Sequence, residues 1–460
     1  MQGGELLRKP RIPWLLVIAV ALLTVLAAAC EEEDKGEVTP AAETPAVETP
    51  AAETPAASPE AVTEEVPGVT DTEILLGTHQ PLTGVASSYS QIAKVTKAYF
   101  DYINDTEGGV YGRKITLLIE DDQYSPPLTA DVVRKLVEQD KVFAILNGLG
   151  EATHLQVVDY LRDQGVPDMY VSTGAVEWVK DPEARPNVFG AIYNYVGEGT
   201  VTGMYIAEHF PGKKLGYIGQ NDAFGFDGFD GVKRGVGDAL EVLPMETFEP
   251  TDPDVNSQVD RLHSAGAEVL AIWGIPTHTG TAIRHARTDL GWDVPIFISQ
   301  TSTNELTLAL GGAENSEGII GPLGLRQAYE TDDPAVQKHI EIIKKYGGLD
   351  TPNYLTFYGQ YIGEIMVLTL EKAGPDLTRE GLIEGAESIK DWRCSVCLRP
   401  GSMSETDHDP AQGLVLGRVE LAPEDAVGAR WVTFGDAYNW QGINPDDITP
   451  DQIVIEPYSD

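Results

Sequence analysis

Cysteine and basic residues are both scarce in this sequence. Only three of its 460 residues are cysteine, so burial of apolar side chains, rather than a disulfide framework, has to hold the chain together. Lys and Arg together number 32 against 72 Asp and Glu, which leaves a formal net charge of −40. A surface of this sign repels phosphate backbones, and we therefore expect no nucleic-acid partner.

The motifs of common hydrolases are also missing. The chain has no G-x-S-x-G nucleophile elbow and no H-E-x-x-H zinc motif, and its eight histidines are scattered singly. Asp121 and Asp122 follow an apolar run, and we interpret them as turn residues rather than as a catalytic pair. We expect no catalytic residues, no metal and no cofactor. A secreted hydrolase is the least favoured interpretation of the chain.

Residues 41–62 lack large apolar side chains and repeat Glu-Thr-Pro, with Ala and Val between the repeats. Proline at such short intervals blocks helix and strand alike, because it fixes φ and removes a backbone donor. No apolar face is present to offset the entropy of ordering the segment. The composition predicts a disordered tether over residues 30–66.

The segment before the tether carries one long hydrophobic run. Arg8, Lys9 and Arg11 precede an almost wholly apolar stretch at residues 13–29, and Cys30 follows. This order is typical of a secretory signal, and it resembles a bacterial lipoprotein signal, whose cysteine becomes lipidated and N-terminal. Lipoboxes favour Leu three places before the cysteine, where this chain has Ala, so a plain signal peptide and an uncleaved anchor stay open. We expect residues 1–29 to be a signal peptide. The mature chain would then be extracytoplasmic and anchored to the cell membrane by a lipid on Cys30.

The rest of the chain alternates strand-like and helix-like segments, and it is too long for one ordinary core. Short apolar runs bounded by Gly or Pro indicate strands, and stretches with apolar residues three and four apart indicate helices. The alternation runs once to about residue 175 and then restarts. It predicts an α/β fold of two lobes, each with a mostly parallel sheet flanked by helices. Strands followed by loops are expected within residues 72–84 and 168–175. Further strands are expected at residues 114–122, 142–147, 214–222, 268–274, 296–300, 413–421 and 430–435.

Five motifs occur in an order and spacing that resemble a known family. They are TDTEILLGTHQPLTG, YINDTEGGVYGRKITLLIEDDQYSPP, ILNGLGEATH, VSTGA and YIGQNDAFG. Together they resemble the type I periplasmic binding proteins, specifically the branched-chain amino acid (leucine/isoleucine/valine-type) substrate-binding proteins of ABC importers, over about residues 67–440. The resemblance implies two Rossmann-like lobes joined by a three-strand hinge. A small ligand would be bound in the cleft between them and delivered to an ABC permease in the membrane.

The resemblance also implies the division of the folded part. Residues 67–192 and 321–392 are expected to form lobe 1, and residues 193–320 and 393–460 to form lobe 2. A ligand-sensing receptor protein without a transport role is the alternative function that stays open.

The candidate ligand site follows from the position of the loops. In an open parallel sheet, ligands lie beyond the carboxyl ends of the strands. Glycines there allow close backbone approach to a carboxylate at a helix N-terminus, hydroxyls add donors, and aromatic rings make an apolar wall. The alternatives are that the glycines only form a tight turn and that each ring only packs in the core. The predicted ligand-binding residues are Tyr89, Gly148, Leu149, Gly150, Ser172, Thr173, Gly174, Ala175, Tyr195, Phe224, Trp273 and Gln300.

One position departs from the family pattern. Amino acid binders of this family commonly place a Thr hydroxyl after the Gly-Ala of the VSTGA loop, where this chain has Val176. The second-lobe loops also offer no obvious acid for an ammonium group. Either Thr173 or Ser172 replaces that hydroxyl, or the ligand is not a plain α-amino acid. The expected ligand is an amino acid, an amide or a related carboxylate, and both features favour the last two.

Cys394 and Cys397 form a C-x-x-C pair near the end of the chain. A zinc half-site, a redox pair and a structural disulfide are each compatible with this spacing. An extracytoplasmic location favours the disulfide, which closes a ring too short to add much stability.

Overall fold

The computed structural model describes residues 65–458. The predictions for the signal segment, for Cys30 and for the tether up to residue 64 therefore lie outside the described residues. Within residues 65–458, no helix combines the length and the apolar character needed to span a bilayer.

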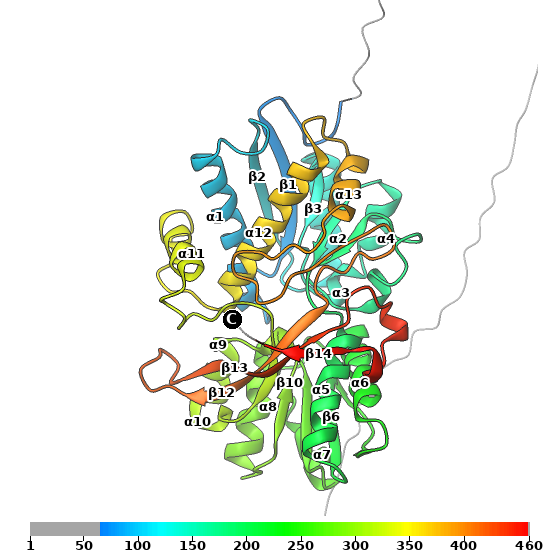
Figure 1. Cartoon of the computed structure of the whole chain (residues 1–460), viewed down its shortest axis with the longest axis vertical. Coiled ribbons are helices and arrows are strands. Elements are labelled where there is room, and N and C mark those ends of the chain that lie inside the picture. Colours follow the sequence, from blue (N-terminus) through cyan, green and yellow to red (C-terminus); the bar gives the residue numbers. More distant parts are fainter. Residues whose placement is uncertain (1–64, 459–460) are drawn as a thin grey trace, which may run out of the picture. The chain divides into compact units, whose positions relative to one another are not determined.

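The first lobe is built on a parallel sheet in the order β2-β1-β3-β4-β5 (Figure 1). Strand β1, which lies between β2 and β3, is almost wholly buried and pairs residue by residue with β2, from Glu73 opposite Lys114 to Gln80 opposite Asp121. The long helix α12 packs against α1 on this sheet, although it lies far along the chain. The strands are β1 Glu73–Gln80, β2 Lys114–Asp121, β3 Ala144–Leu146, β4 Asp168–Val171 and β5 Val188–Gly190; the helices are α1 Ser90–Thr106, α2 Pro126–Arg134, α3 Glu151–His154, α4 Val158–Asp163, α11 Pro334–Lys345, α12 Tyr354–Ala373 and α13 Arg379–Glu387.

The second lobe is built on a larger sheet in the order β14-β13-β12-β11-β10-β9-β6-β7, with β8 beside β6. Strands β6 to β11 run parallel, whereas β12, β13 and β14 add an antiparallel extension. The predicted boundary at residue 321 falls inside β11, so the chain leaves the second sheet only after Leu323. The strands are β6 Lys214–Gln220, β7 Glu241–Val242, β8 Glu246–Phe248, β9 Val269–Trp273, β10 Ile296–Ile298, β11 Ile320–Leu323, β12 Gly413–Leu421, β13 Ala429–Asn439 and β14 Val454–Pro457; the helices are α5 Tyr195–His209, α6 Ala223–Val236, α7 Asn256–Ser264, α8 Pro276–Arg284, α9 Glu305–Gly311 and α10 Ala313–Ser316.

Helices α5 and α6 pack unusually closely, because both are rich in glycine. A Cβ on Gly199 would lie 2.5 Å from the backbone oxygen of Gly228, and one on Gly231 would lie 2.3 Å from that of Val196. Glycine normally weakens a helix, but here it lets two backbones approach. The helix that follows β6 is thereby fixed, together with the cleft residues at its start.

Three segments connect the lobes and form the hinge. They are residues 191–194, 324–333 and 388–412, and the last two pair through Leu398 N to Gly324 O at 2.8 Å and Arg326 N to Val396 O at 2.9 Å. A disulfide joins Cys394 to Cys397 beside this pairing. Of the three alternatives for the C-x-x-C pair, the structure therefore contains the disulfide, and it lies at the hinge.

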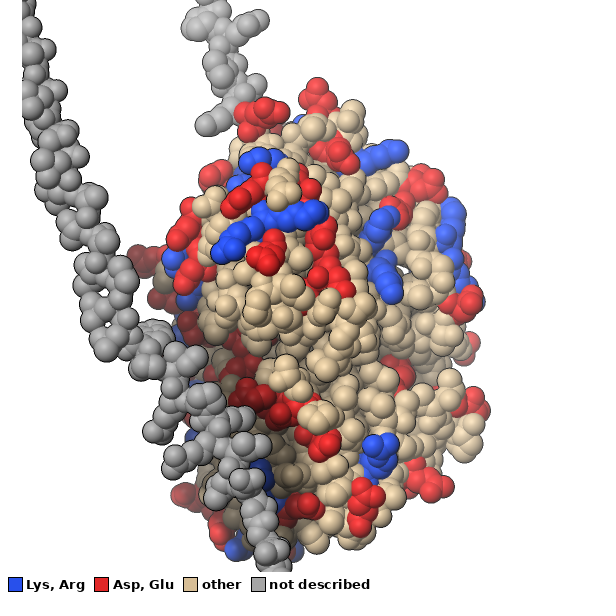
Figure 2. All heavy atoms as spheres, turned by 180° about the vertical axis from the view of Figure 1, so that it is seen from behind, with Lys and Arg blue, Asp and Glu red and all other residues tan. Residues whose placement is uncertain are grey.

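Acidic side chains are spread over the reverse face of the molecule, whereas basic side chains gather mainly on the first lobe (Figure 2). Many of the basic groups lie beside carboxylates, as Lys135 does between Glu120 and Asp140.

Candidate ligand-binding site

The two lobes touch across the cleft in this structure. Tyr89 Oη of the first lobe donates to Thr301 O of the second at 2.9 Å. Val176 N donates to Asp227 Oδ2 at 3.0 Å on the opposite side. Bonds of this kind form only when the lobes are close, so the structure shows a closed arrangement.

A cavity of about 80 Å³ lies between the lobes at the carboxyl ends of the strands. Its wall is mainly aromatic and aliphatic, with Glu151, Ser172, Gln300 and Thr301 as the polar members. None of its lining residues, all within the described part of the chain, is Lys, Arg or His. The lining is Tyr89, Ile92, Tyr124, Leu149, Gly150, Glu151, Ser172, Ile192, Tyr195, Phe224, Ile275, Gln300, Thr301, Tyr354, Leu355 and Tyr358.

The glycine loop after β3 is shaped by packing. Gly150 has φ 100°, and a Cβ on it would lie 2.2 Å from the Tyr124 ring; a Cβ on Gly148 would lie 2.2 Å from His79 Nε2. Two backbone bonds tie the loop to the end of β4: Gly150 N donates to Ser172 O at 3.2 Å, and Gly148 O accepts from Ser172 N at 2.9 Å. Helix α3 ends after four residues. The glycines therefore shape a tight turn, and the carboxylate site expected at this helix start stays a prediction.

Glu151 places a carboxyl group in the cavity wall directly after this loop. Its Oε2 accepts from Thr173 Oγ1 at 2.9 Å and from Trp178 Nε1 at 2.8 Å. Burial raises the pKa of Glu151 to about 8, against the lowering effect of these hydrogen bonds. No described residue donates a hydrogen bond to Oε1, so this oxygen remains available to a ligand.

Ser172 is the second polar group with spare capacity. Its Oγ accepts from Tyr358 Oη at 3.2 Å, and Tyr358 Oη in turn accepts from Asn147 Nδ2 at 3.0 Å. The Ser172 hydroxyl proton is thus directed by a fixed network and is free to be donated. Helix α12 supplies Tyr358, which anchors the first-lobe wall to the late part of the chain.

Gln300 uses its polar atoms within the protein. Its backbone N donates to Glu198 Oε1 at 2.8 Å, and its Nε2 donates to Glu198 Oε2 at 2.7 Å and to Tyr193 O at 2.9 Å. Burial raises the pKa of Glu198 to about 7. Gln300 therefore ties the loop after β10 to hinge segment 191–194 and presents mainly its body to the cavity.

The comparisons with known proteins agree with this architecture. The sequence model of the family described as "Periplasmic binding protein" matches residues 73–426, which is well over half of the chain. The chain belongs to the periplasmic binding protein family. It is a solute-binding protein, and the family consists of solute-binding proteins rather than enzymes. Membership also implies an extracytoplasmic location.

Two relatives from Pseudomonas aeruginosa illustrate the relationship. An amino acid binding protein is 24% identical over 62% of this chain and 75% of its own length. A leucine-, isoleucine-, valine-, threonine- and alanine-binding protein is 26% identical over 55% of this chain and 66% of its own length. These matches support the branched-chain amino acid branch of the family.

Solved structures share the fold at low sequence identity. A fatty acid ABC transporter substrate-binding protein from Thermomonospora curvata has a TM-score of 0.71 at 23% identity, covering 84% of this chain and 97% of its own. A branched-chain amino acid ABC transporter protein from Thermus thermophilus with bound valine has a TM-score of 0.70 at 17% identity, covering 81% and 97%. The fold prediction, an α/β protein of two lobes, is confirmed.

Within this family member, the cavity brings together seven of the predicted ligand-binding residues. They are Tyr89, Leu149, Gly150, Ser172, Tyr195, Phe224 and Gln300. The Tyr195 and Phe224 rings lie 4.7 Å apart and form one aromatic corner.

Five predicted residues do not line the cavity. Trp273 is fully buried and stacks on Tyr217 at 5.3 Å, so its placement in the cleft is corrected to the core of the second lobe. Gly174 packs against Tyr193 O and the Tyr195 ring, Ala175 is buried, and Gly148 packs on His79. Thr173 does not line the cavity, but its hydroxyl donates to Glu151 and orients that side chain.

Sequence reasoning missed Glu151 and Tyr358. Glu151 immediately follows Gly150 at the carboxyl end of β3, which was a sufficient signal for it. The expectation that no acid would face the ligand considered the second lobe alone, and the acid lies in the first. No local signal marks Tyr358, which lies inside the long helix α12.

Proposed function

We propose that this protein is the solute receptor of an ABC importer and that its ligand has an apolar body and one nitrogen-containing head group, a protonated amine or an amide. The composition of the cavity wall carries this proposal. The wall combines aromatic and aliphatic side chains with an open carboxyl oxygen, at Glu151, and a hydroxyl that can donate, at Ser172. Apolar pockets with a few convergent polar groups are typical of small-molecule sites.

A carboxylate ligand is less well supported than the sequence suggested. No cationic side chain lines the cavity, and Asp222 and Asp227 lie close enough to Glu151 to raise its pKa further. An acid in the wall with two more acids nearby disfavours a buried anion and favours a cation or a neutral donor. The relatives named for amino acids bind zwitterions, whose ammonium group agrees with this choice although their carboxylate does not distinguish the two.

The mechanism follows from the cross-lobe bonds. A solute held by the first lobe adds contacts to the second only when the lobes close, so its binding shifts the equilibrium toward the closed form. The bond from Tyr89 to Thr301 closes the mouth beside the ligand. The ABC permease would then recognise the closed form.

The proposal also includes a lipid anchor on Cys30, with the segment after it as a tether. Residues 31–66, fully extended as polyproline II, could span roughly 110 Å. Such a reach would hold the receptor at the membrane and let it turn toward the permease. Replacing Cys30→Ser should move the protein from the membrane fraction to the soluble fraction, whereas retention in the membrane fraction would favour an uncleaved anchor.

A thermal-shift panel on ligand-stripped protein tests the ligand class. The panel contains short amines, amides, urea, amino acids and carboxylates, each with the same apolar group where chemistry allows. We expect amines or amides to raise the melting temperature, and we expect Glu151→Gln to weaken that shift while the exposed Glu177→Gln leaves it unchanged. A shift given by carboxylates alone would overturn the proposal for the head group.

A further inference from the structure

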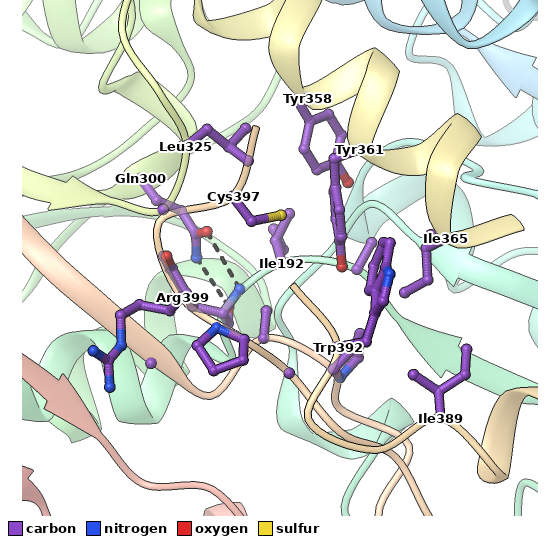
Figure 3. A pocket seen from close by; sticks show the side chains of 18 of the residues that line it. Ile192, Gln300, Leu325, Tyr358, Tyr361, Ile365, Ile389, Trp392, Cys397 and Arg399 are labelled. Carbon is purple, nitrogen blue, oxygen red and sulfur yellow. Dashed lines mark hydrogen bonds between the residues drawn. The ribbon is translucent and has the colours of Figure 1, made fainter. Parts of the chain in front are cut away.

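A second cavity of about 60 Å³ lies at the hinge (Figure 3). All three hinge segments contribute to it, together with helix α12. Its wall is largely aromatic and aliphatic, and its main members are Tyr193, Leu325, Tyr361, Ile365, Ile389 and Trp392.

The hinge cavity and the ligand cavity have walls in common. Ile192, Gln300, Tyr354 and Tyr358 line both. A single layer of side chains therefore separates the two spaces. Gln300 and Tyr358 are held by hydrogen bonds, whereas Ile192 is only half-buried and its side chain can make none. A change of rotamer at Ile192 is accordingly the least costly way to join the cavities.

The hinge cavity suits an uncharged group. Tyr361 stacks beside Trp392 with ring centroids 6.4 Å apart, and both face the space in Figure 3. The hydroxyls of Tyr193 and Tyr361 form no hydrogen bond with any residue between 65 and 458, so each can serve a ligand atom. Arg399 is the charged member of the lining. Its Nη2 pairs with Glu456, whereas its Nε is buried and has no hydrogen-bond partner among the described residues, so this N–H can donate to a neutral acceptor atom.

We propose that the hinge cavity is a subsite for the far end of an elongated ligand, whose head group lies at Glu151 and whose apolar tail passes Ile192 into the hinge. This inference rests on the proposed function, and it specifies in addition that the solute is elongated. A tail in this position contacts all three hinge segments. The affinity therefore depends on ligand length through contacts at the hinge. The ligand class is therefore a linear alkyl or arylalkyl amine or amide rather than a compact one.

A homologous series of straight-chain amines and amides, measured by titration calorimetry on the full-length protein, tests the inference. In the native protein we expect affinity to rise by roughly fourfold for each methylene, including those beyond the length that fills the cleft. Ala411 lines the hinge cavity, and Ala411→Leu should fill part of it. This variant should remove the gain for long members, by about tenfold, and leave short members unchanged.

The matched control is Ala328→Leu, the same enlargement in a separate hollow at the surface between the first-lobe helices and strand β13. It should leave the whole series unchanged. The inference is overturned if the gain stops at the same chain length in native protein and in Ala411→Leu, or if Ala411→Leu weakens short and long members equally. If not even the short members bind the native protein, the proposed head-group chemistry fails, which is a different result.

A second measurement does not depend on how Ala411→Leu folds. A long-chain amine with a terminal bromine should quench tryptophan fluorescence, and Trp392→Phe should remove most of that quenching when both proteins are compared at saturating probe. A short bromoamine should quench equally in both proteins. Equal quenching by the long probe with and without Trp392 would contradict a tail at the hinge.

Discussion

The two walls of the ligand cavity use their polar groups differently. In the first lobe, Glu151 Oε1 and the Ser172 proton remain available to a solute. In the second lobe, Thr301 Oγ1 and Ser302 Oγ both donate to Gly274 O, and Gln300 is bound to Glu198 and Tyr193. The first lobe therefore recognises the head group, whereas the second supplies an apolar wall and closes the cleft.

This difference explains how one cleft can both select a solute and couple its binding to closure of the lobes. Recognition by groups in a single lobe allows the solute to bind the open form first. Closure is then stabilised by protein–protein bonds between the lobes and by burial of the apolar part of the ligand. Different residues therefore select the ligand and stabilise the closed state.

Loss of the first-lobe acid should have the largest effect. Glu151→Leu removes the open carboxyl oxygen and also leaves the donors of Thr173 and Trp178 without their acceptor. We expect an amine or amide ligand to bind about 100-fold more weakly, since hydrogen bonds to charged groups contribute about 1.5–3 kcal/mol. Calorimetric titration checks this, with Glu177→Leu as the exposed control. A loss below about threefold would show that the head group lies elsewhere.

The pH dependence should distinguish an amine from an amide. Because burial raises the pKa of Glu151 to about 8, the carboxyl is protonated at neutral pH in the ligand-free protein. An alkylguanidinium probe needs the ionised form, so its affinity should rise by roughly 50-fold from about pH 6 to about pH 8 and then level off. An amide that accepts the Glu151 carboxyl proton should show the opposite dependence. Its affinity should be high at pH values below the pKa of Glu151 and should fall at pH values above it.

Two neighbouring acids shape this profile. Burial raises the pKa of Asp227 to about 6, and it raises the pKa of Asp222 as well. Raised values in carboxyl groups mean that the folded state binds protons more tightly than the unfolded state, so the free energy of unfolding falls as pH rises through this range. The titration should therefore be repeated on Glu151→Gln, whose affinity for the guanidinium probe should no longer follow the step near pH 8.

Loss of the closing bond should have a moderate effect. Tyr89→Phe keeps the ring in the cavity wall but removes the hydrogen bond to Thr301 O. A neutral hydrogen bond contributes about 1 kcal/mol, so we expect about fivefold weaker binding and a larger open population in ligand-free small-angle scattering. Tyr111→Phe is the matched control, because its hydroxyl also donates to a backbone oxygen, that of Glu371, within the first lobe. Equal effects of the two substitutions would contradict a closing role.

Loss of a second-lobe hydroxyl should have the smallest effect. Thr301→Val removes a donor that is bound to Gly274 O, while keeping the backbone oxygen that Tyr89 contacts. We expect a change in affinity of about twofold or less. A loss comparable to that of Glu151→Leu would mean that both lobes recognise the head group.

The fold could be predicted because periodicity and loop residues agree over long stretches. The strand at residues 114–122 appears where its pattern indicates, as β2 at Lys114–Asp121. Helix α5 begins at Tyr195, because the Asn194 side chain accepts from Gly197 N and caps the helix there. Asn is a preferred N-cap residue and can be recognised in a sequence. Here the glycines at 197 and 199 weaken the helical pattern that should follow the cap.

The site was only partly predictable, for reasons of packing. Cleft loops are placed by strand ends, and this located Ser172 and Phe224 correctly in the wall. Whether a ring faces the cleft or the core depends on neighbours that are far away in the chain: Trp273 is covered by Tyr217 and the glycines of α6. Tyr358 reaches the site only because α12 packs back onto the first lobe, which no local pattern encodes.

A crystal structure of the complex with the tightest-binding amine or amide would test the central claim most directly. The account predicts the head-group nitrogen within hydrogen-bonding distance of Glu151 Oε1, the Ser172 hydroxyl bonded to the ligand, and no polar ligand contact with Gln300 or Thr301. A head group bound to second-lobe side chains, with Glu151 Oε1 left without a partner, would contradict it.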